Sequence, residues 1–332
     1  MTTTGPTETD RTPSPSAGPF GAPYCWVFAD GRFIEDAVAS VSLHANILSY
    51  GTGTFEGMRG FWNEEQQQLY LLEAAAHFRR MRRSATILGR PLHESVEELV
   101  AAATTLLRRN DVRSDVYVRP LFVLTGEELP VRMHGITARL SIAATPVVGD
   151  YIDPGGIRCK ISTWRRAPDN VMPSRAKVCG SYVGPALAKT EAINAGYDEA
   201  IMLNSRGNVA EGTTSNVFMR RGTEWITPSV NEDVLEGVTR GQLKTLLEER
   251  TGAPVTERGI QPSELFACDE LLLCGTAALV VPVVSVDDRP IADGVAGATT
   301  ISLLEELRSI ACRTSGRHHE WTMPIYDDPE AP

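Results

Sequence analysis

One stretch of the chain, from Lys177 to Phe218, brings an amine, a phenol and a carboxylate close together in sequence. Tyr182 follows Lys177, and Glu211 lies in the later run Ala-Glu-Gly-Thr-Thr-Ser-Asn-Val-Phe. A lysine amine that is partly removed from water is neutral and can form an imine with a carbonyl group. A tyrosine hydroxyl and a buried carboxylate are the groups that a pyridoxal ring needs at its phenolic oxygen and ring nitrogen. The grouping therefore predicts imine chemistry on such a ring.

Lysine is scarce in this chain, which narrows the choice of amine. Only Lys160, Lys177, Lys189 and Lys244 occur among 32 lysines and arginines. Each member of the proposed set also has an ordinary structural explanation when it is taken alone. Most lysines are solvated, Glu211 could be a turn residue, and Tyr182 could be a core aromatic at a helix start. The combination is what favours chemistry.

Two glycine-containing turns could bind a phosphate group. The first runs from Leu235 to Arg240 and leads into a predicted helix, whose free N–H groups and dipole attract anions. The second, Cys274-Gly275-Thr276-Ala277-Ala278, leaves an apolar strand and could present the Thr276 hydroxyl together with backbone amides. The run Arg79–Arg83 could supply a guanidinium. We expect these segments to meet near Lys177.

The composition is typical of a soluble enzyme. The 332 residues are 42% hydrophobic and 22% charged, which is enough for one large domain or two medium ones. The net charge of −10 argues against a nucleic-acid or anionic-membrane surface. The six cysteines contain no Cys-x-x-Cys pair and the six histidines are scattered, so we expect reduced thiols, no metal site and no metal hydrolase. Without a signal peptide or an apolar run of about 20 residues, the predicted location is cytoplasmic.

The order of the elements predicts two α+β domains. We expect a disordered Thr/Pro/Ser/Gly-rich tail at 1–24, a small domain at 25–148, an interdomain loop at 149–156 and a large domain at 157–332. Strands and helices mix without strict βαβ alternation, which disfavours a doubly wound sheet. The predicted strands are a hairpin at 26–34 and the segments 68–72, 116–124, 138–145, 158–163, 200–203, 217–220 and 270–274. The predicted helices are 74–88, 95–109, 182–195, 238–250 and 298–312.

Taken together, the motifs resemble the class IV pyridoxal-phosphate aminotransferases, and most of all the branched-chain amino acid aminotransferases. The similarity extends from about Trp26 to Ile325. The segments that carry it are Ser49–Phe61, His77–Ala85, Tyr117–Leu121, Ala167–Lys177, Gly196–Asn204, Ala210–Phe218, Leu235–Arg240 and Cys274–Ala278. The resemblance implies fold type IV, with a small α/β N-terminal domain, a larger pseudo-barrel C-terminal domain and a homodimeric or larger assembly. It also implies pyridoxal 5'-phosphate as the cofactor.

The resemblance assigns roles to particular residues. Lys177 would form the covalent link to the cofactor and carry the proton, Glu211 would pair with the ring nitrogen, and Tyr182 would face the phenolic oxygen. The phosphate would be bound by Arg80, Val238, Thr239, Gly275 and Thr276. The substrate would be bound by Tyr50, Phe55, Gly57, Tyr117, Arg119, Thr276, Ala277 and Ala278, with Tyr50 a candidate to close the partner's site.

The implied reaction is a ping-pong transamination between an L-amino acid and a 2-oxo acid. One pocket would accept both an apolar side chain and glutamate, and Arg119 resembles the arginine that takes glutamate's distal carboxylate. An inter-strand ion pair is the alternative role of Arg119, because arginine is often a surface partner.

Three departures from the family pattern affect substrate recognition. Ser181 stands where asparagine is usual, Val147 stands where bacterial enzymes carry a pocket tryptophan, and the 126–134 loop lacks the usual Gly-Met pattern. An unusual substrate of specialised metabolism therefore stays open. So do a D-amino acid aminotransferase, an R-selective amine aminotransferase and an aminodeoxychorismate-type lyase. A catalytically idle binding protein would be expected to lack Lys177 or Glu211, and both are present.

Overall fold

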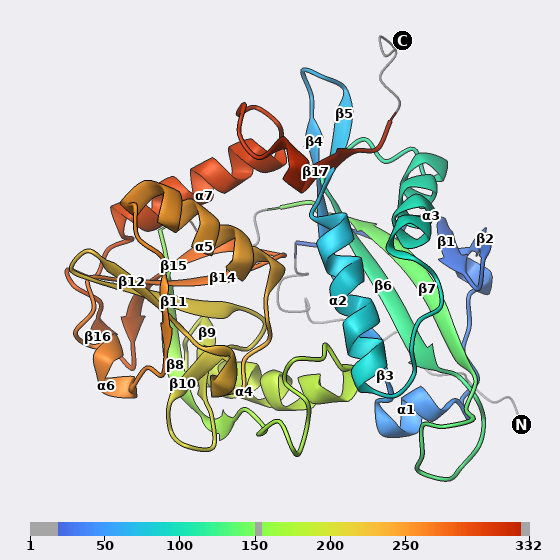
Figure 1. Ribbon diagram of the computed structural model, residues 1–332, viewed down its shortest axis with the longest axis horizontal. Coiled ribbons are helices and arrows are strands. Elements are labelled where there is room, and N and C mark those ends of the chain that lie inside the picture. Colours follow the sequence, from blue (N-terminus) through green and yellow to red (C-terminus); the bar gives the residue numbers. More distant parts are fainter. Residues whose placement is uncertain (1–18, 150–154, 327–332) are drawn as a thin grey trace, which may run out of the picture.

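The computed structural model describes residues 19–149 and 155–326, in which helices pack against two sheets (Figure 1). The strands of the first sheet are β1 Trp26–Ala29, β2 Arg32–Glu35, β3 Gly53–Phe55, β4 Met58–Asn63, β5 Gln68–Leu72, β6 Val116–Leu124, β7 Ala138–Pro146 and β17 Thr322–Pro324. Their order is β17-β5-β4-β6-β7-β1-β2, with β3 paired to β6. All pairings within this sheet are antiparallel.

The second sheet has nine strands in the described part of the chain. They are β8 Ile157–Arg165, β9 Glu199–Leu203, β10 Val209–Gly212, β11 Asn216–Arg221, β12 Glu224–Pro228, β13 Thr256–Arg258, β14 Glu270–Gly275, β15 Leu279–Val286 and β16 Arg289–Pro290. The order is β10-β9-β8-β15-β14-β11-β12-β13, with β16 beside β15. An additional pairing joins β10, at one end of this path, to β11, its sixth strand, and the closed ring of strands makes the sheet barrel-like.

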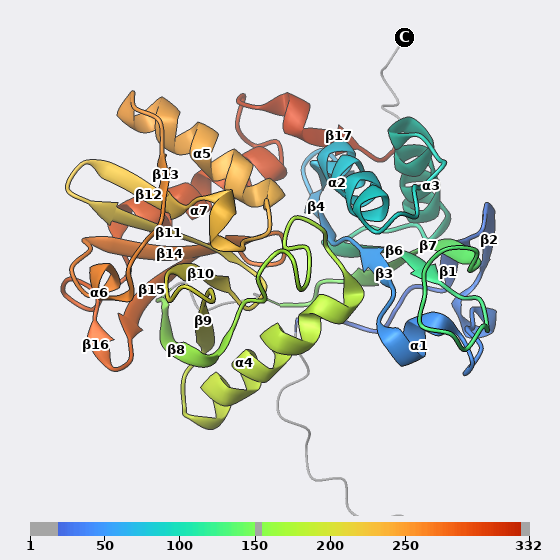
Figure 2. The ribbon, with the colours of Figure 1, turned by 60° about the horizontal axis from the view of Figure 1, so that its bottom comes forward.

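Helices cover both sheets. The α-helices are α1 Asn46–Tyr50, α2 Ala74–Ile87, α3 Val96–Arg109, α4 Val183–Asn194, α5 Val238–Thr251, α6 Pro262–Leu265 and α7 Ala298–Ala311. The 3-10 helices are η1 Asp36–Val38, η2 Cys179–Tyr182, η3 Val230–Glu232 and η4 His319–Trp321. Figures 1 and 2 place α2 and α3 with the first sheet in one half of the molecule, and α4, α5 and α7 with the second sheet in the other.

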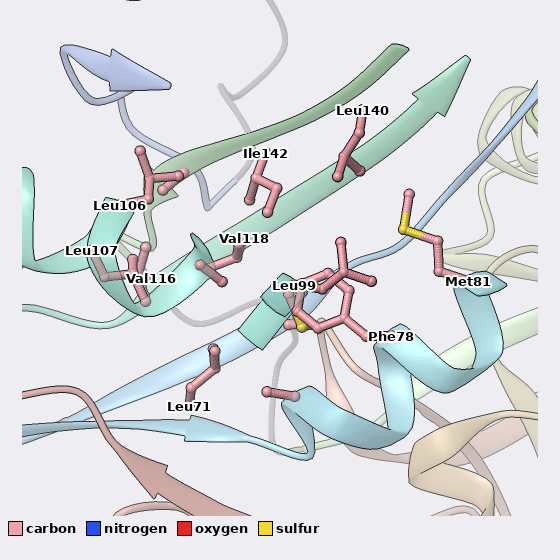
Figure 3. Close-up of a cluster of buried hydrophobic side chains, with 14 of the residues drawn as sticks. Leu71, Phe78, Met81, Leu99, Leu106, Leu107, Val116, Val118, Leu140 and Ile142 are labelled. Atoms are coloured by element: carbon pink, nitrogen blue, oxygen red, sulfur yellow. The ribbon is translucent and has the colours of Figure 1, made fainter. Parts of the chain in front are cut away.

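The apolar core between the first sheet and helices α2 and α3 buries one face of β6 and leaves its other face for the site. Along β6, buried and half-buried residues alternate, as expected for a strand with one face in the core. Val116 and Val118 face the core beneath Phe78 of α2 and Leu99 of α3 (Figure 3). Tyr117 and Arg119 therefore project from the opposite face of the strand. A capping box at Ser95 fixes the start of α3, as the sequence predicts.

The second core lies on both faces of its sheet. On β11, Val217 and Met219 pack into one apolar cluster, whereas Phe218 between them packs into another. The cluster around Phe218 includes Leu243 of α5 and Leu307 of α7. Because both faces are covered, the three consecutive residues Val217 to Met219 are all apolar.

Residues 19–24 belong to the predicted disordered tail, and in the structure they lie along the end of β7. Gly21 N donates to Pro146 O at 2.9 Å and Tyr24 N to Ala144 O at 3.1 Å. A Thr/Pro/Ser/Gly-rich composition predicts that the segment cannot form a packed core of its own. It does not reveal that the segment can hydrogen-bond to the backbone of a distant strand. The remaining tail residues, 1–18, lie outside the described residues.

The predicted elements are present in the described residues, and the α+β prediction is confirmed. The predicted domain limits stay a prediction; most of the loop proposed at 149–156 lies outside the described residues. Near its C-terminal end the chain returns to the first sheet, where β17 pairs with β5. Within residues 19–149 and 155–326, no helix is both long and apolar enough to cross a membrane.

Candidate active site

A cavity of about 220 Å³ lies where residues of the first sheet, α2, η2, the second sheet and the start of α5 meet. The predicted site residues that line it are Phe55, Gly57, Arg80, Tyr117, Arg119, Lys177, Tyr182, Glu211, Val238, Thr239, Gly275, Thr276 and Ala277. Residues that line it without having been assigned a role from the sequence include Phe20, Arg166, Thr213, Asn216 and Gly237. The fold thus brings most of the candidates to one place, and their individual roles stay proposals.

Lys177 follows β8 of the second sheet in sequence, but its backbone is held by β3 of the first sheet and by α2. Its backbone N–H donates to Ser84 Oγ at 3.0 Å, and its carbonyl accepts from Phe55 N at 3.1 Å. The side-chain Nζ donates to Tyr182 Oη at 2.6 Å and lies 4.9 Å from the Phe55 ring centroid. The η2 turn delivers Tyr182 to this position. The amine and the phenol are therefore already paired at the cavity wall.

Glu211 lies on β10 and is buried. One carboxylate oxygen lies 3.1 Å from Arg166 Nε, and the other accepts from Asn216 Nδ2 at 3.1 Å and Leu235 N at 3.0 Å. A carboxylate offers about four acceptor positions, so one position is left for a further donor. Burial raises the pKa of Glu211, and the charge of Arg166 opposes that rise. Arg166 was missed because nothing in its sequence neighbourhood links it to β10.

The start of α5 is built to accept an anion. Gly237 at its N-cap provides no side-chain cap, so the first N–H groups of the helix stay available beside Val238 and Thr239. A Cβ at Gly237 would lie 2.1 Å from Asn216 Oδ1, so a side chain here would displace Asn216, which donates to Glu211. Arg80 Nη1 donates to Glu236 O at 3.0 Å, which ties α2 to this turn.

A fully buried carboxylate, Glu56, positions Arg80. Its two oxygens accept from Arg80 Nε and Nη2, each at 2.7 Å. Burial would raise the pKa of Glu56, but Arg80 and His77 outweigh that effect and hold it well below its usual range. His77 and Arg80 are three residues apart and therefore share one face of α2, from which both reach Glu56.

His77 extends this network to the second sheet. Its Nδ1 lies 2.8 Å from Glu56 Oε2, and its Nε2 lies 3.5 Å from Thr276 Oγ1. Burial lowers the pKa of His77, which favours the neutral ring at pH 7. A neutral ring that donates Nδ1–H to Glu56 leaves Nε2 to accept from the Thr276 hydroxyl. The network thus orients two of the predicted phosphate ligands, Arg80 and Thr276.

The opposite wall of the cavity is aromatic and cationic. Arg119 Nη2 donates to Tyr117 Oη at 3.2 Å, and its guanidinium lies 4.7 Å from the Phe55 ring centroid. Within the described residues Arg119 has no carboxylate partner, so the inter-strand ion pair is not formed there. A Cβ at Gly57 would lie 1.8 Å from Tyr117 Oη, which explains the glycine. This wall offers one cation within an apolar surface.

Arg59 is a further residue that the sequence did not single out. Its Nη1 donates to Ala277 O at 3.0 Å, and its Nη2 forms an ion pair with Asp115 at 2.9 Å. It therefore fastens the Gly275–Ala277 turn to β4 of the first sheet. The predicted amide donors of that turn are positioned from the other half of the molecule.

Two predicted site residues lie away from the cavity lining. Tyr50 is exposed at the end of α1, and its hydroxyl donates to Leu129 O at 2.7 Å, within the 126–134 loop. Ala278 packs against the second core. Their proposed substrate contacts stay predictions. In residues 19–149 and 155–326, no group of three or more His, Cys, Asp or Glu side chains could hold a metal ion.

Comparison with known proteins decides the family. The family model for amino-transferase class IV matches residues 53–286, a range that holds every predicted site residue except Tyr50. The chain belongs to the class IV aminotransferases. The predicted family is therefore confirmed, and so is the enzyme class, a pyridoxal-phosphate-dependent aminotransferase.

Individual relatives agree with this assignment. A probable branched-chain-amino-acid aminotransferase of Aquifex aeolicus is 43% identical over 303 residues, covering 91% of this chain and 97% of that protein. A branched-chain aminotransferase of Thermoproteus uzoniensis, solved with norvaline, is 35% identical with a TM-score of 0.86, covering 91% of this chain and 100% of that one. A branched-chain amino acid aminotransferase of Thermobaculum terrenum, solved in its PLP form, is 32% identical with a TM-score of 0.87, covering 92% and 99%. This class IV aminotransferase therefore has the predicted type IV fold.

Proposed function

We propose that this aminotransferase moves an amino group between an L-amino acid with a branched or related apolar side chain and a 2-oxo acid, with glutamate as the other amino donor. The observation that carries the proposal is the placement of the Lys177–Tyr182 pair and the buried Glu211 on one cavity. The names of the relatives support the substrate class.

Pyridoxal 5'-phosphate is the cofactor of this proposal, and the residues present fit it. The uncapped start of α5 with Arg80 and Thr276 suits a phosphate group, and Glu211 keeps one acceptor position for a ring N–H. Glu211 would pair with the ring nitrogen and Tyr182 with the phenolic oxygen. Val238, Thr239 and Gly275 would donate their backbone amides to the phosphate, and Thr239 would also donate its hydroxyl. When bound, the cofactor supplies an electron sink for the substrate's Cα.

Lys177 is the proposed catalytic residue. Its Nζ would hold the cofactor covalently, and after release it would carry the proton to and from the substrate's Cα. The Tyr182 hydroxyl, 2.6 Å from Nζ, would keep the amine oriented both for covalent attachment and for proton transfer. The Phe55 ring, whose centroid lies 4.9 Å from Nζ, would limit the access of water on that side.

Substrate recognition would use both walls of the cavity. The Thr276 and Ala277 amides would take the α-carboxylate. Phe55, Gly57 and Tyr117 would bound the side-chain space, with Arg119 free to pair with the distal carboxylate of glutamate. Ala278 and Tyr50 complete the proposed set.

We further propose a homodimer that acts in the cytoplasm. Exposed apolar residues gather in the 38–50 segment, namely Val38, Val41, Leu43, Leu48 and Tyr50. Exposed apolar groups of this kind mark association surfaces. Tyr50 would then reach the partner's site from this surface.

A half-reaction spectrum tests the function. Protein loaded with pyridoxal 5'-phosphate is mixed separately with L-Leu, L-Ile, L-Val, L-Glu, L-Phe and D-Ala, and the loss of the cofactor's visible band is followed. Conversion by L-Leu or L-Ile and by L-Glu is expected. Conversion by D-Ala alone would instead indicate a D-amino acid aminotransferase. Release of more than one product molecule per active site without an amino acceptor would indicate a lyase.

Glu211→Gln tests the ring-nitrogen partner. An amide cannot hold a proton on the ring nitrogen, so we expect kcat with L-Leu to fall by about 100-fold or more. The dissociation constant of pyridoxal 5'-phosphate should change by less than about tenfold, because the phosphate ligands are intact. Glu224→Gln, at an exposed position in the same sheet, is the matched control. An unchanged kcat in Glu211→Gln would rule out this role.

A further inference from the structure

The segment 19–24 places an aromatic side chain in the lining of the active-site cavity. Val148 N donates to Pro19 O at 2.7 Å, and Phe20 forms an antiparallel bridge with Val147. A Cβ at Gly21 would lie 2.9 Å from Pro146 Cγ, so glycine allows the segment to lie this close to β7. The backbone pairing fixes where the Phe20 side chain leaves the chain.

The Phe20 ring lines the cavity together with Tyr117. Their ring centroids are 5.1 Å apart, and the rings are tilted by 58°. This separation is within the range of favourable aromatic pairs. Phe20 is nevertheless 37% exposed, so part of the residue remains accessible to water. An apolar group that covers this part would gain about 25 cal/mol for each Å² removed from water.

A chain of contacts leads from the reactive amine to this ring. Lys177 Nζ lies 4.9 Å from the Phe55 centroid, and the Arg119 guanidinium lies 4.7 Å from the same ring. The same guanidinium lies 5.1 Å from the Tyr117 ring. Phe20 packs on Tyr117 and lines the same cavity, so it adds a further contact to this line, which it meets through Tyr117.

We propose that Phe20 is a specificity-determining residue, whose ring forms an apolar wall for the side chain of the amino-acid substrate. This inference rests on the proposed function. An apolar side chain buries the accessible part of Phe20, whereas the distal carboxylate of glutamate is taken by Arg119. Phe20 thus favours apolar substrates over glutamate within one cavity.

The test compares Phe20→Ala and Phe20→Leu with the wild-type holoenzyme in single half-reactions with L-Leu and L-Glu. For Phe20→Ala, we expect the half-saturating L-Leu concentration to rise by about tenfold, with the maximal rate within about threefold. For L-Glu, the half-saturating concentration and the maximal rate should stay within about threefold of the wild type. Phe20→Leu should restore most of the lost apparent affinity for L-Leu. Val148→Ala removes an exposed side chain beside the same pairing and serves as the control.

The outcomes separate this inference from the proposed function. If the wild-type enzyme converts both substrates and Phe20→Ala leaves the ratio of the half-saturating concentrations of L-Leu and L-Glu unchanged, only the role of Phe20 is overturned. An equal loss for both substrates, or no recovery in Phe20→Leu, indicates a structural effect and also overturns it. A wild-type enzyme that converts neither substrate overturns the proposed function, and the inference falls with it. The dissociation constant of pyridoxal 5'-phosphate, measured by fluorescence, should be the same in all variants within about threefold.

Discussion

Lys177→Ala is expected to lose transamination by at least about four orders of magnitude in kcat. The variant removes the only lysine amine that lines the cavity among the described residues, and with it the proposed covalent attachment and proton carrier. Backbone contacts of residue 177 with Ser84 and Phe55 do not involve the side chain, so the fold should persist. The measurement is the steady-state rate with L-Leu and a 2-oxo acid.

A cofactor-binding assay shows whether Lys177→Ala loses activity because the amine is missing or because the cavity no longer binds the cofactor. Lys177→Ala should still bind pyridoxal 5'-phosphate through Arg80 and the start of α5, but without the visible band of the lysine-linked cofactor. Lys160→Ala, on β8 and outside the cavity lining, is the matched control and should retain activity. Turnover of Lys177→Ala within tenfold of the wild type would show that another group does the chemistry.

Glu56→Gln is expected to destabilise the apo protein by about 3 kcal/mol or more. The buried Arg80 guanidinium would keep its charge while losing its anionic partner, and the amide would face it with a donor in place of an acceptor. Urea unfolding at pH 7 measures this difference. Affinity for pyridoxal 5'-phosphate should also fall, because Arg80 and His77 lose the group that orients them.

The pH dependence of this difference follows from the pKa of Glu56. That pKa is raised by burial but lowered further by Arg80 and His77, so in the folded state it lies below the ordinary value of 4.5. The ionised carboxylate therefore contributes stability that is fully present above pH 4.5 and is lost as the pH falls toward the folded-state pKa. The gap between wild type and Glu56→Gln should shrink in that acid range.

A surface substitution provides the reference for Glu56→Gln. Glu35→Gln changes an exposed carboxyl on the edge strand β2 and should alter stability by no more than about 0.5 kcal/mol. If Glu56→Gln unfolds within about 1 kcal/mol of the wild type at pH 7, the buried ion pair does not stabilise the fold as described.

Local patterns predicted the elements well where one face of an element is buried. The strand Gln68–Leu72 and the capping box at Ser95 appear as predicted, because alternation and capping depend on neighbouring residues. Shorter elements such as α1 and β3 were not predicted. Their residues show no sustained periodicity and are held by pairing with distant segments, such as that of Gly53 with Val123.

The motifs also predicted Lys177, Tyr182 and Glu211 as one site, and the fold brings them to one cavity. The partners that orient them were largely missed. Arg166 and Glu211 are distant in sequence and meet only in the folded chain. Val147 departs from the family pattern, but only the three-dimensional structure shows that Phe20 of the predicted tail pairs with it.

The contacts that complete the cavity also bear on how the enzyme matures. Arg80 reaches Glu236, 156 residues away, and Arg59 reaches Ala277, 218 residues away. Such closures are costly in chain entropy, so these links form late relative to local helices and hairpins. A ligand that binds only the assembled cavity stabilises the joined state by mass action. The supply of cofactor in the cell would then set how much newly made chain completes its assembly, and not only how much of it is active.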